Sequence, residues 1–167
     1  MAEAGASEQG CQLCECERAG AEHIAGLIRT SSGAETEAVG RRIAASLRPG
    51  DVVLVSGDLG SGKTTLIRGA CRELGVEEPV VSPTFTIGRR YRGSVPVSHL
   101  DLFRLPTLAG EDPGLLDDYL TPDAIAFIEW PAVAGRAIED VLGGRGGRLR
   151  RIEIRHAGGD EREILLG

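Results

Sequence analysis

From about residue 31 onward, apolar positions alternate between helical spacing and short continuous runs. Over 39–47 the apolar residues recur every three or four positions and stop at Pro49-Gly50, which predicts a helix capped by either Ser31 or Ser32. Residues 51–56 follow as a continuous apolar run rich in β-branched residues. Such a run is typical of a strand that is buried on both faces. The pattern therefore predicts a helix followed by a buried strand.

Later segments predict an α/β fold. A glycine-rich turn after the buried strand leads into a second segment of helical spacing, for which Gly75 is the expected C-terminal cap. Further strands are predicted at 84–91, 95–102 and 124–130, a short helix at 115–120, and a closing antiparallel hairpin at 148–156 and 161–166. The turn Gly57-Asp-Leu-Gly-Ser-Gly-Lys-Thr64 has the spacing of a phosphate-binding P-loop. Together with this turn, the elements predict one P-loop NTPase domain with a mostly parallel central sheet, an antiparallel hairpin extension and flanking helices.

Length and composition set the domain boundaries. The chain has 167 residues, of which 41% are hydrophobic, enough for one core without metals or disulfides. Residues 1–28 contain few large apolar groups and show no period, so we expect a disordered extension there and the ATPase domain at 29–167. No apolar run approaches the roughly 20 residues that cross a bilayer, and no signal-peptide core opens the chain. We therefore expect a cytoplasmic protein without a membrane partner.

The cysteines are concentrated in this extension. Cys11, Cys14 and Cys16 lie close together, whereas Cys71 falls in a helical pattern, so no disulfide framework can be recognised. Three thiolates and His23 could bind Zn²⁺, because Cys-x-x-Cys is a known ligand spacing. The second ligand pair lacks the usual separation, and we therefore leave the extension without an assigned role.

The charge of the chain argues against direct binding of nucleic acid. Its formal net charge is −6, so we expect no DNA partner and only indirect contact with RNA. Among the 19 basic residues only Lys63 is a lysine. A composition that otherwise uses arginine indicates that a compact ammonium is needed at this position.

Lys63 lies in a Walker A motif, Gly57-Asp-Leu-Gly-Ser-Gly-Lys-Thr64, between a predicted buried strand and a predicted helix. Backbone N–H groups of such a loop turn towards phosphates, and the helix N-terminus adds its positive end. The alternative is a glycine-rich turn that binds nothing. The expected nucleotide-binding residues of the loop are Gly57, Asp58, Leu59, Gly60, Ser61, Gly62, Lys63, Thr64 and Thr65.

Oxygen ligands for Mg²⁺ are predicted from the ends of two strands. Thr64 is the expected ligand in the loop. Asp101 and Glu129 each follow an apolar run, so in a parallel sheet both carboxylates would lie at the edge that faces the loop. Either carboxylate could instead be a helix cap or a surface charge.

A hydroxyl-bearing segment, Val81-Ser-Pro-Thr-Phe-Thr86, follows the loop by about twenty residues. In nucleotide-dependent switches a hydroxyl in this position meets the γ-phosphate and its metal. Thr84 is our candidate, with Ser82 behind it, and a proline-stiffened entry into a strand is the alternative. The expected catalytic set is Lys63, Thr84, Asp101 and Glu129.

ATP is the expected nucleotide. Common GTPases select guanine with an Asn/Thr-Lys-x-Asp motif, and the chain has no asparagine and no lysine outside the Walker A loop. GTP is therefore disfavoured.

The order and spacing of five segments closely resemble the TsaE family: residues 57–65, Ser82-Pro-Thr-Phe-Thr86, His99-Leu-Asp-Leu-Phe-Arg104, Leu116-Asp-Asp-Tyr-Leu120 and Ile128-Glu-Trp-Pro131. The resemblance covers about residues 31–166. It implies a weak ATPase that joins two partner proteins, TsaB and TsaD, in making the threonylcarbamoyl modification on the tRNA adenosine next to the anticodon. In that family TsaD performs the transfer, and ATP hydrolysis resets the complex.

The resemblance also implies roles for individual residues. Lys63 would bind phosphate, Thr64 and Glu129 would hold Mg²⁺, and Asp101 would stabilise the metal or water. Trp130 would border the nucleotide, and Thr36 would place a hydroxyl near it. The sequence departs from the family pattern after Pro131, so Arg136 is not matched to a functional arginine.

Two rival functions use the same features. A small-molecule kinase would need an acceptor pocket and commonly a closing lid, for which Arg89, Arg90 and Arg92 could be imagined, although a solvated or partner-facing patch is the simpler interpretation. A tRNA-binding module that uses nucleotide only for structure is the second rival, and the acidic composition weighs against it.

Overall fold

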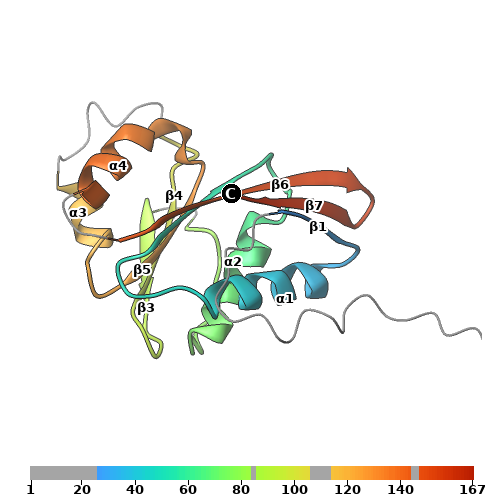
Figure 1. The fold of residues 1–167 in the computed structure, drawn as a ribbon, viewed down its shortest axis with the longest axis horizontal. Coiled ribbons are helices and arrows are strands. Elements are labelled where there is room, and N and C mark those ends of the chain that lie inside the picture. Colours follow the sequence, from blue (N-terminus) through green and yellow to red (C-terminus); the bar gives the residue numbers. More distant parts are fainter. Residues whose placement is uncertain (1–25, 84–85, 106–113, 144–146) are drawn as a thin grey trace, which may run out of the picture.

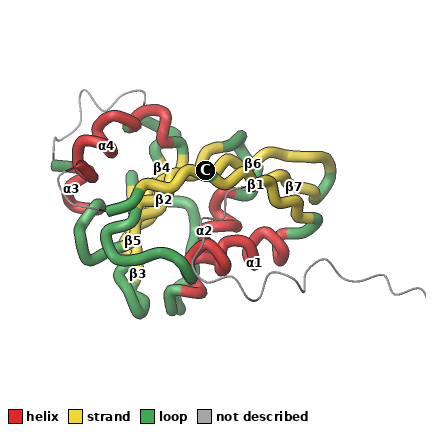
Figure 2. The backbone as a smooth tube through the Cα atoms, in the orientation of Figure 1, coloured by secondary structure: helices red, strands yellow, loops and turns green. Residues whose placement is uncertain are grey.

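The structure is a computed structural model that describes residues 26–83, 86–105, 114–143 and 147–167. Figures 1 and 2 show a central sheet with helices on both of its faces. The elements in chain order are β1 (Gly26–Thr30), α1 (Gly33–Ala44), β2 (Val52–Ser56), α2 (Lys63–Glu73), β3 (Gly88–Tyr91), β4 (Val97–Asp101), α3 (Leu115–Tyr119), β5 (Ile125–Glu129), the 3₁₀ turn η2 (Pro131–Val133), α4 (Gly135–Gly143), β6 (Leu149–Gly158) and β7 (Glu161–Leu166).

The sheet has seven strands in the order β1-β7-β6-β2-β5-β4-β3. Its four central strands, β6, β2, β5 and β4, run parallel. Antiparallel strands continue it on both sides: β3 pairs with β4, and the hairpin β6–β7 is followed by β1. The prediction of an α/β fold with a parallel centre and an antiparallel hairpin extension is confirmed.

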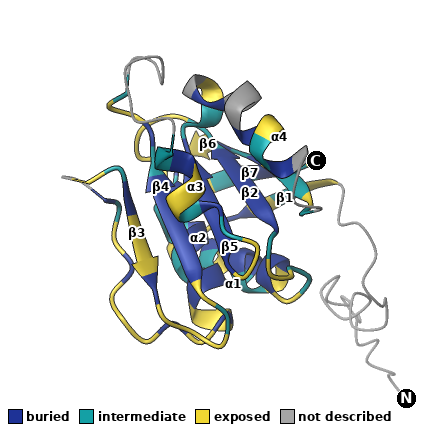
Figure 3. Ribbon diagram, turned by 90° about the vertical axis from the view of Figure 1, so that its left-hand side faces the viewer, coloured by how far each residue is buried: buried dark blue, intermediate teal, exposed yellow. Residues whose placement is uncertain are grey.

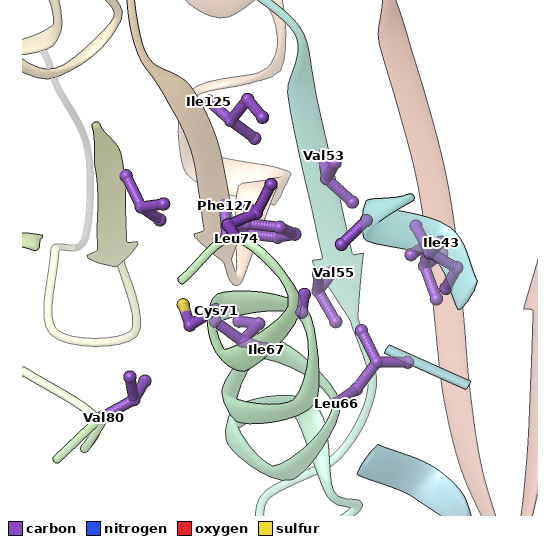
Figure 4. Close-up of a cluster of buried hydrophobic side chains, with 14 of the residues drawn as sticks. Ile43, Val53, Val55, Leu66, Ile67, Cys71, Leu74, Val80, Ile125 and Phe127 are labelled. Atoms are coloured by element: carbon purple, nitrogen blue, oxygen red, sulfur yellow. The ribbon is translucent and has the colours of Figure 1, made fainter. Parts of the chain in front are cut away.

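Two apolar clusters fill the space between the sheet and its helices. Helices α1 and α2 cover one face, and α3 and α4 cover the other (Figure 1). In Figure 4, α2 directs Leu66, Ile67 and Cys71 towards the strands that carry Val55 and Phe127. Figure 3 shows that the central strands are buried, whereas the edge strand β3 is exposed along much of its length. Because α2 packs against β2 and β5, its first turn lies beside the ends of these two strands.

Local signals correctly predicted the start of α1 and the end of α2. The Ser32 side chain accepts a hydrogen bond from Glu35 N, and the Glu35 carboxylate in turn accepts one from Ser31 N. At the other helix, Gly75 has a φ of 77° directly after the C-cap residue, and Val76 N donates to Cys71 O. Ser32 is thus the cap of α1, and Gly75 terminates α2.

Several predicted boundaries and one helix differ from the structure. Helix α1 ends at Ala44, before the expected stop at Pro49-Gly50. Strand β1 begins at Gly26, so the folded domain starts three residues before the expected boundary at 29. Helix α4 was not predicted, although Ile138 and Leu142 lie one turn apart on its buried side. Strand β3 begins at Gly88, later than the predicted start at residue 84. Strand β1 pairs with β7, and α4 packs into the cluster that contains residues of β2, so the partners of these two elements lie far away in the sequence.

Among the helices of the described residues, none has the length and apolar character that a bilayer-spanning segment requires.

Candidate functional site at the loop between β2 and α2

The glycine-rich loop connects the buried strand β2 to α2, as its sequence predicted. Gly57 has a φ of 142°, and a Cβ at this position would lie 2.2 Å from Ile154 O. Gly62 is the N-cap of α2 with a φ of 106°, in the left-handed region that side chains rarely adopt. The loop can therefore follow this path only with glycine at these positions. It leaves the N-terminus of an eleven-residue helix open, which suits an anion.

Lys63 is the first residue of α2, and its side chain is folded back over the loop. Its exposed fraction is only 4%, and its Nζ donates to Gly57 O and Asp58 O, each at 2.9 Å. Burial lowers the pKa of Lys63 below 10.5, and the nearby carboxylates of Glu129, Asp101 and Asp58 partly oppose this change. The ammonium is thus held over the loop by backbone carbonyls.

Trp130 lies against the same ammonium. Lys63 Nζ lies 4.1 Å from the centre of the Trp130 ring, a distance at which a cation is attracted to an aromatic face. The Phe103 ring lies 4.8 Å from that of Trp130, centre to centre, and Phe103 itself is 55% exposed. Trp130 has a φ of 57°, a strained value for a bulky residue. Such strain is common where a side chain is aimed at a site.

Glu129 connects the loop to the interior of the sheet. It ends β5 with an exposed fraction of 3%. Its Oε1 accepts a hydrogen bond from Thr64 Oγ1 at 2.8 Å and lies 2.9 Å from His99 Nε2. The hydroxyl and the carboxylate predicted to bind Mg²⁺ are therefore in direct contact.

Asp101 lies beside Glu129, because the two residues are paired in the register of β4 and β5. Its Oδ2 accepts a hydrogen bond from Ser82 Oγ at 2.6 Å, and its Oδ1 accepts one from Phe103 N at 3.1 Å. The side chain is half-buried. The prediction that both carboxylates emerge at the loop-facing edge of the sheet is correct, since the parallel strands end side by side.

A cavity of about 260 Å³ opens at this edge. A second cavity of about 290 Å³ adjoins it and shares Leu59, Ser82, Asp101 and Phe103 with it. The lining of the first cavity consists of Leu59, Gly60, Gly62, Lys63, Thr64, Thr65, Ser82, Asp101, Phe103, Glu129 and Trp130.

The structure places some predicted residues away from this cavity. Thr36 is buried, and its hydroxyl is bonded to Thr30 Oγ1 at 2.9 Å and to Ser32 O at 3.1 Å. Ser61 Oγ is buried without a hydrogen-bond partner among the described residues. Thr84 lies outside the described residues, so its role stays a prediction. The same holds for Cys11, Cys14, Cys16 and His23.

Two residues of the site were not assigned a role from the sequence. His99 contacts Glu129 from within the sheet, and the Phe103 ring packs at a tilt against the Trp130 ring. The strand alternation contained a signal for His99, because it lies two residues before Asp101 and therefore on the same face of β4. No local signal indicated the contact of Phe103 with a residue of another strand end.

The donor chemistry of the cavity fits a phosphate and a hard cation. A buried ammonium and the N-terminus of α2 provide positive charge, while Thr64, Asp101 and Glu129 provide the oxygen ligands that Mg²⁺ prefers. Over the described parts of the chain, no group of three or more His, Cys, Asp and Glu side chains forms a metal site. The arrangement is therefore suited to a phosphate chain whose bound cation also takes oxygen ligands from the protein.

Comparison with known proteins agrees with this geometry. A family model described as "Threonylcarbamoyl adenosine biosynthesis protein TsaE" matches residues 30–164. A Bacillus subtilis protein named tRNA threonylcarbamoyladenosine biosynthesis protein TsaE is 42% identical over 139 residues, which cover 83% of this chain and 82% of that protein. A Synechocystis protein of the same name is 42% identical over 107 residues, 58% of this chain and 64% of that protein. The crystal structure of YdiB from Bacillus subtilis has a TM-score of 0.63 at 33% identity and 87% coverage of both chains.

Proposed function

Because the chain belongs to the TsaE family, we propose that it is the ATP-hydrolysing subunit required for the threonylcarbamoyladenosine modification of tRNA. It acts with TsaB- and TsaD-like proteins in the cytoplasm and meets tRNA only through that complex. The observation that carries the proposal is the contact of Thr64 with Glu129 beside the paired Asp101, directly under the glycine-rich loop. A structural turn without a ligand would have no use for a buried carboxylate beside two half-buried polar side chains.

The loop and Lys63 bind the phosphates. In the structure the ammonium donates to two loop carbonyls, and it can exchange one of these for a phosphate oxygen without leaving the cavity. The Trp130 ring lies against the ammonium, and the Phe103 ring packs against Trp130. Because the ammonium is screened from water, its attraction to phosphate is stronger than that of an exposed lysine.

Thr64, Glu129 and Asp101 would hold Mg²⁺. The ion, when bound, offsets the negative charge of the phosphate oxygens and of the leaving group. Asp101 is the more exposed of the two carboxylates and is free to accept a hydrogen bond from water, while Ser82 and Phe103 N fix its orientation. Thr84 belongs to the proposal as the switch hydroxyl because of its sequence position, two residues after Ser82.

Nucleotide binding is tested first on the isolated protein. We expect Lys63→Ala to weaken the binding of ADP with Mg²⁺ by at least about tenfold, or about 1.4 kcal/mol, in isothermal titration. Emission of Trp130, the only tryptophan of the chain, should change on binding. Arg29→Ala, which removes an exposed cation outside this cavity, is the matched control. Native affinity in the lysine variant would contradict the assignment of the loop.

Hydrolysis and assembly are tested with the partners. Slow ATP hydrolysis by the isolated chain should rise when the TsaB- and TsaD-like proteins are added, and a pull-down should retain the three proteins together in a nucleotide-dependent manner. Equal rates of ATP hydrolysis with and without the partners would contradict the proposed switch role. If the three proteins did not associate, the proposed role in tRNA modification would be contradicted.

A small-molecule kinase remains the second candidate. It is favoured by the cavity of about 290 Å³ that adjoins the loop and shares Asp101 with it, because an acceptor hydroxyl could lie there. A phosphorylated product formed from ATP and a small acceptor without any partner protein would favour this activity.

A further inference from the structure

His99 is a fully buried polar side chain behind the candidate site. It lies in the middle of β4, and its exposed fraction is 0%. Its partner in the register of β5 is Phe127, a core residue. An apolar side chain would fill this position without the cost of desolvating an imidazole. The hydrogen bond of its side chain is therefore the feature that favours a histidine at this position.

Among the described residues, only one of the two ring nitrogens of His99 has a hydrogen-bond partner. Nε2 lies 2.9 Å from Glu129 Oε1, whereas Nδ1 is buried and has no hydrogen-bond partner among the described residues. An ionised carboxylate only accepts hydrogen bonds, so the hydrogen of the imidazole lies on Nε2. A hydrogen on Nδ1 would be an unsatisfied buried donor. The structure thus fixes which nitrogen donates and to which atom.

Glu129 Oε1 is contacted by two donors in different surroundings. Thr64 approaches from the loop side and lines the ligand cavity. His99 approaches from within the sheet, where it is fully buried and does not line that cavity. The histidine is therefore the fixed support of the carboxylate.

We propose that His99 is a positioning residue that orients Glu129 for Mg²⁺ through its Nε2–H. The inference rests on the proposed function, since it assigns a role to the carboxylate that would hold the ion. A hydrogen bond behind a ligand carboxylate restricts its rotation and aims its oxygens, and loss of such supports commonly costs 10–100-fold in metal affinity. His99 itself does not touch nucleotide or metal.

The test measures ADP affinity by isothermal titration, once with Mg²⁺ and once with EDTA. The ratio of the two affinities reports how much the ion contributes. We expect His99→Leu, which keeps the volume but removes the donor, to reduce this ratio by about tenfold while ADP affinity in EDTA changes by less than about twofold. His99→Gln can place an amide N–H near the position of Nε2 and should retain more of the ratio than His99→Asn, whose amide is shorter.

Ser98→Ala is the matched control. Ser98 is the neighbouring residue on β4, is equally buried, points to the opposite face, and its Oγ has no partner among the described residues. Its replacement should leave both affinities unchanged. Thermal melting of every variant separates loss of the fold from loss of the support, and the comparison of the glutamine with the asparagine variant remains decisive if His99→Leu does not fold.

The outcomes are distinct. A native ratio in His99→Leu, an equal loss of affinity in Mg²⁺ and EDTA, or identical behaviour of the glutamine and asparagine variants would overturn the role of His99. If the native protein itself bound ADP equally well in Mg²⁺ and EDTA, the proposed function would fail instead. A reduced ratio in His99→Leu that the glutamine variant restores would support the inference.

Discussion

Lys63 shows how burial and charge compete at a single side chain. Its ammonium is 4% exposed, and its positive charge is stabilised by two loop carbonyls, the ring of Trp130 and nearby carboxylates. Removal from water nevertheless dominates and lowers the pKa. The side chain therefore loses its proton at a lower pH than an exposed lysine does.

This lowered pKa predicts a dependence of nucleotide affinity on pH. Phosphate binding needs the ammonium, which is present below the pKa and is lost as the pH rises through it. ADP affinity should therefore begin to fall below pH 10.5, by at most about tenfold per pH unit, in titrations that follow Trp130 emission. Lys63→Ala, which carries no ammonium, should bind more weakly at every pH and show no decline in the same window. A flat profile for the native protein up to that pH would contradict the prediction.

Two helices position the glycine-rich loop, and they approach each other through glycine. A Cβ on Gly40 of α1 would lie 2.0 Å from Leu66 O of α2, and a Cβ on Gly69 of α2 would lie 2.0 Å from Glu37 O of α1. No larger residue can occupy either position while the backbones stay this close. The close approach matters for the site because α2 begins with Lys63 and Thr64.

Gly40→Ala is expected to destabilise the protein although alanine is the better helix former. Helix propensity alone would stabilise it by about 1 kcal/mol, whereas forced separation of the helices should cost about 2–3 kcal/mol net, measured by urea unfolding. Gly33→Ala, where the nearest side-chain atom would be 3.9 Å away, is the control and should be neutral or stabilising. Equal stability of the two variants would show that the helices do not need their present distance.

Strand β1 forms one edge of the sheet and pairs with β7, which lies near the other end of the chain. Ile28 packs against the core of the α1 and α2 face, whereas Leu27 is 53% exposed. The folded unit therefore begins before the boundary that composition alone suggested. Glycine and a single buried side chain in a five-residue strand give too weak a periodic signal to detect it.

A protein that begins at residue 29 should be less stable than one that begins at residue 26. Loss of the Ile28 packing and of its strand pairing should cost about 1–2 kcal/mol, which lowers Tm by roughly 2–8 °C in calorimetry. Within the full chain, Ile28→Ala should reproduce part of this loss and Leu27→Ala should not. The same Tm for both truncated proteins would show that β1 contributes nothing to the stability of the domain.

Local sequence patterns were sufficient to predict the strand, loop and helix that carry Lys63 and Thr64, a serine cap at position 31 or 32, the helix stop at Gly75, and the strand ends that carry Asp101 and Glu129. These features depend on neighbouring residues, through backbone conformation and alternation, and local rules predict them. The fold was needed to show that His99 contacts Glu129, that Phe103 packs against Trp130, and that β1 adds an edge strand to the sheet. Each of these contacts joins segments far apart in the chain, and the order of strands that brings them together is selected by packing of the whole core, which no local pattern encodes.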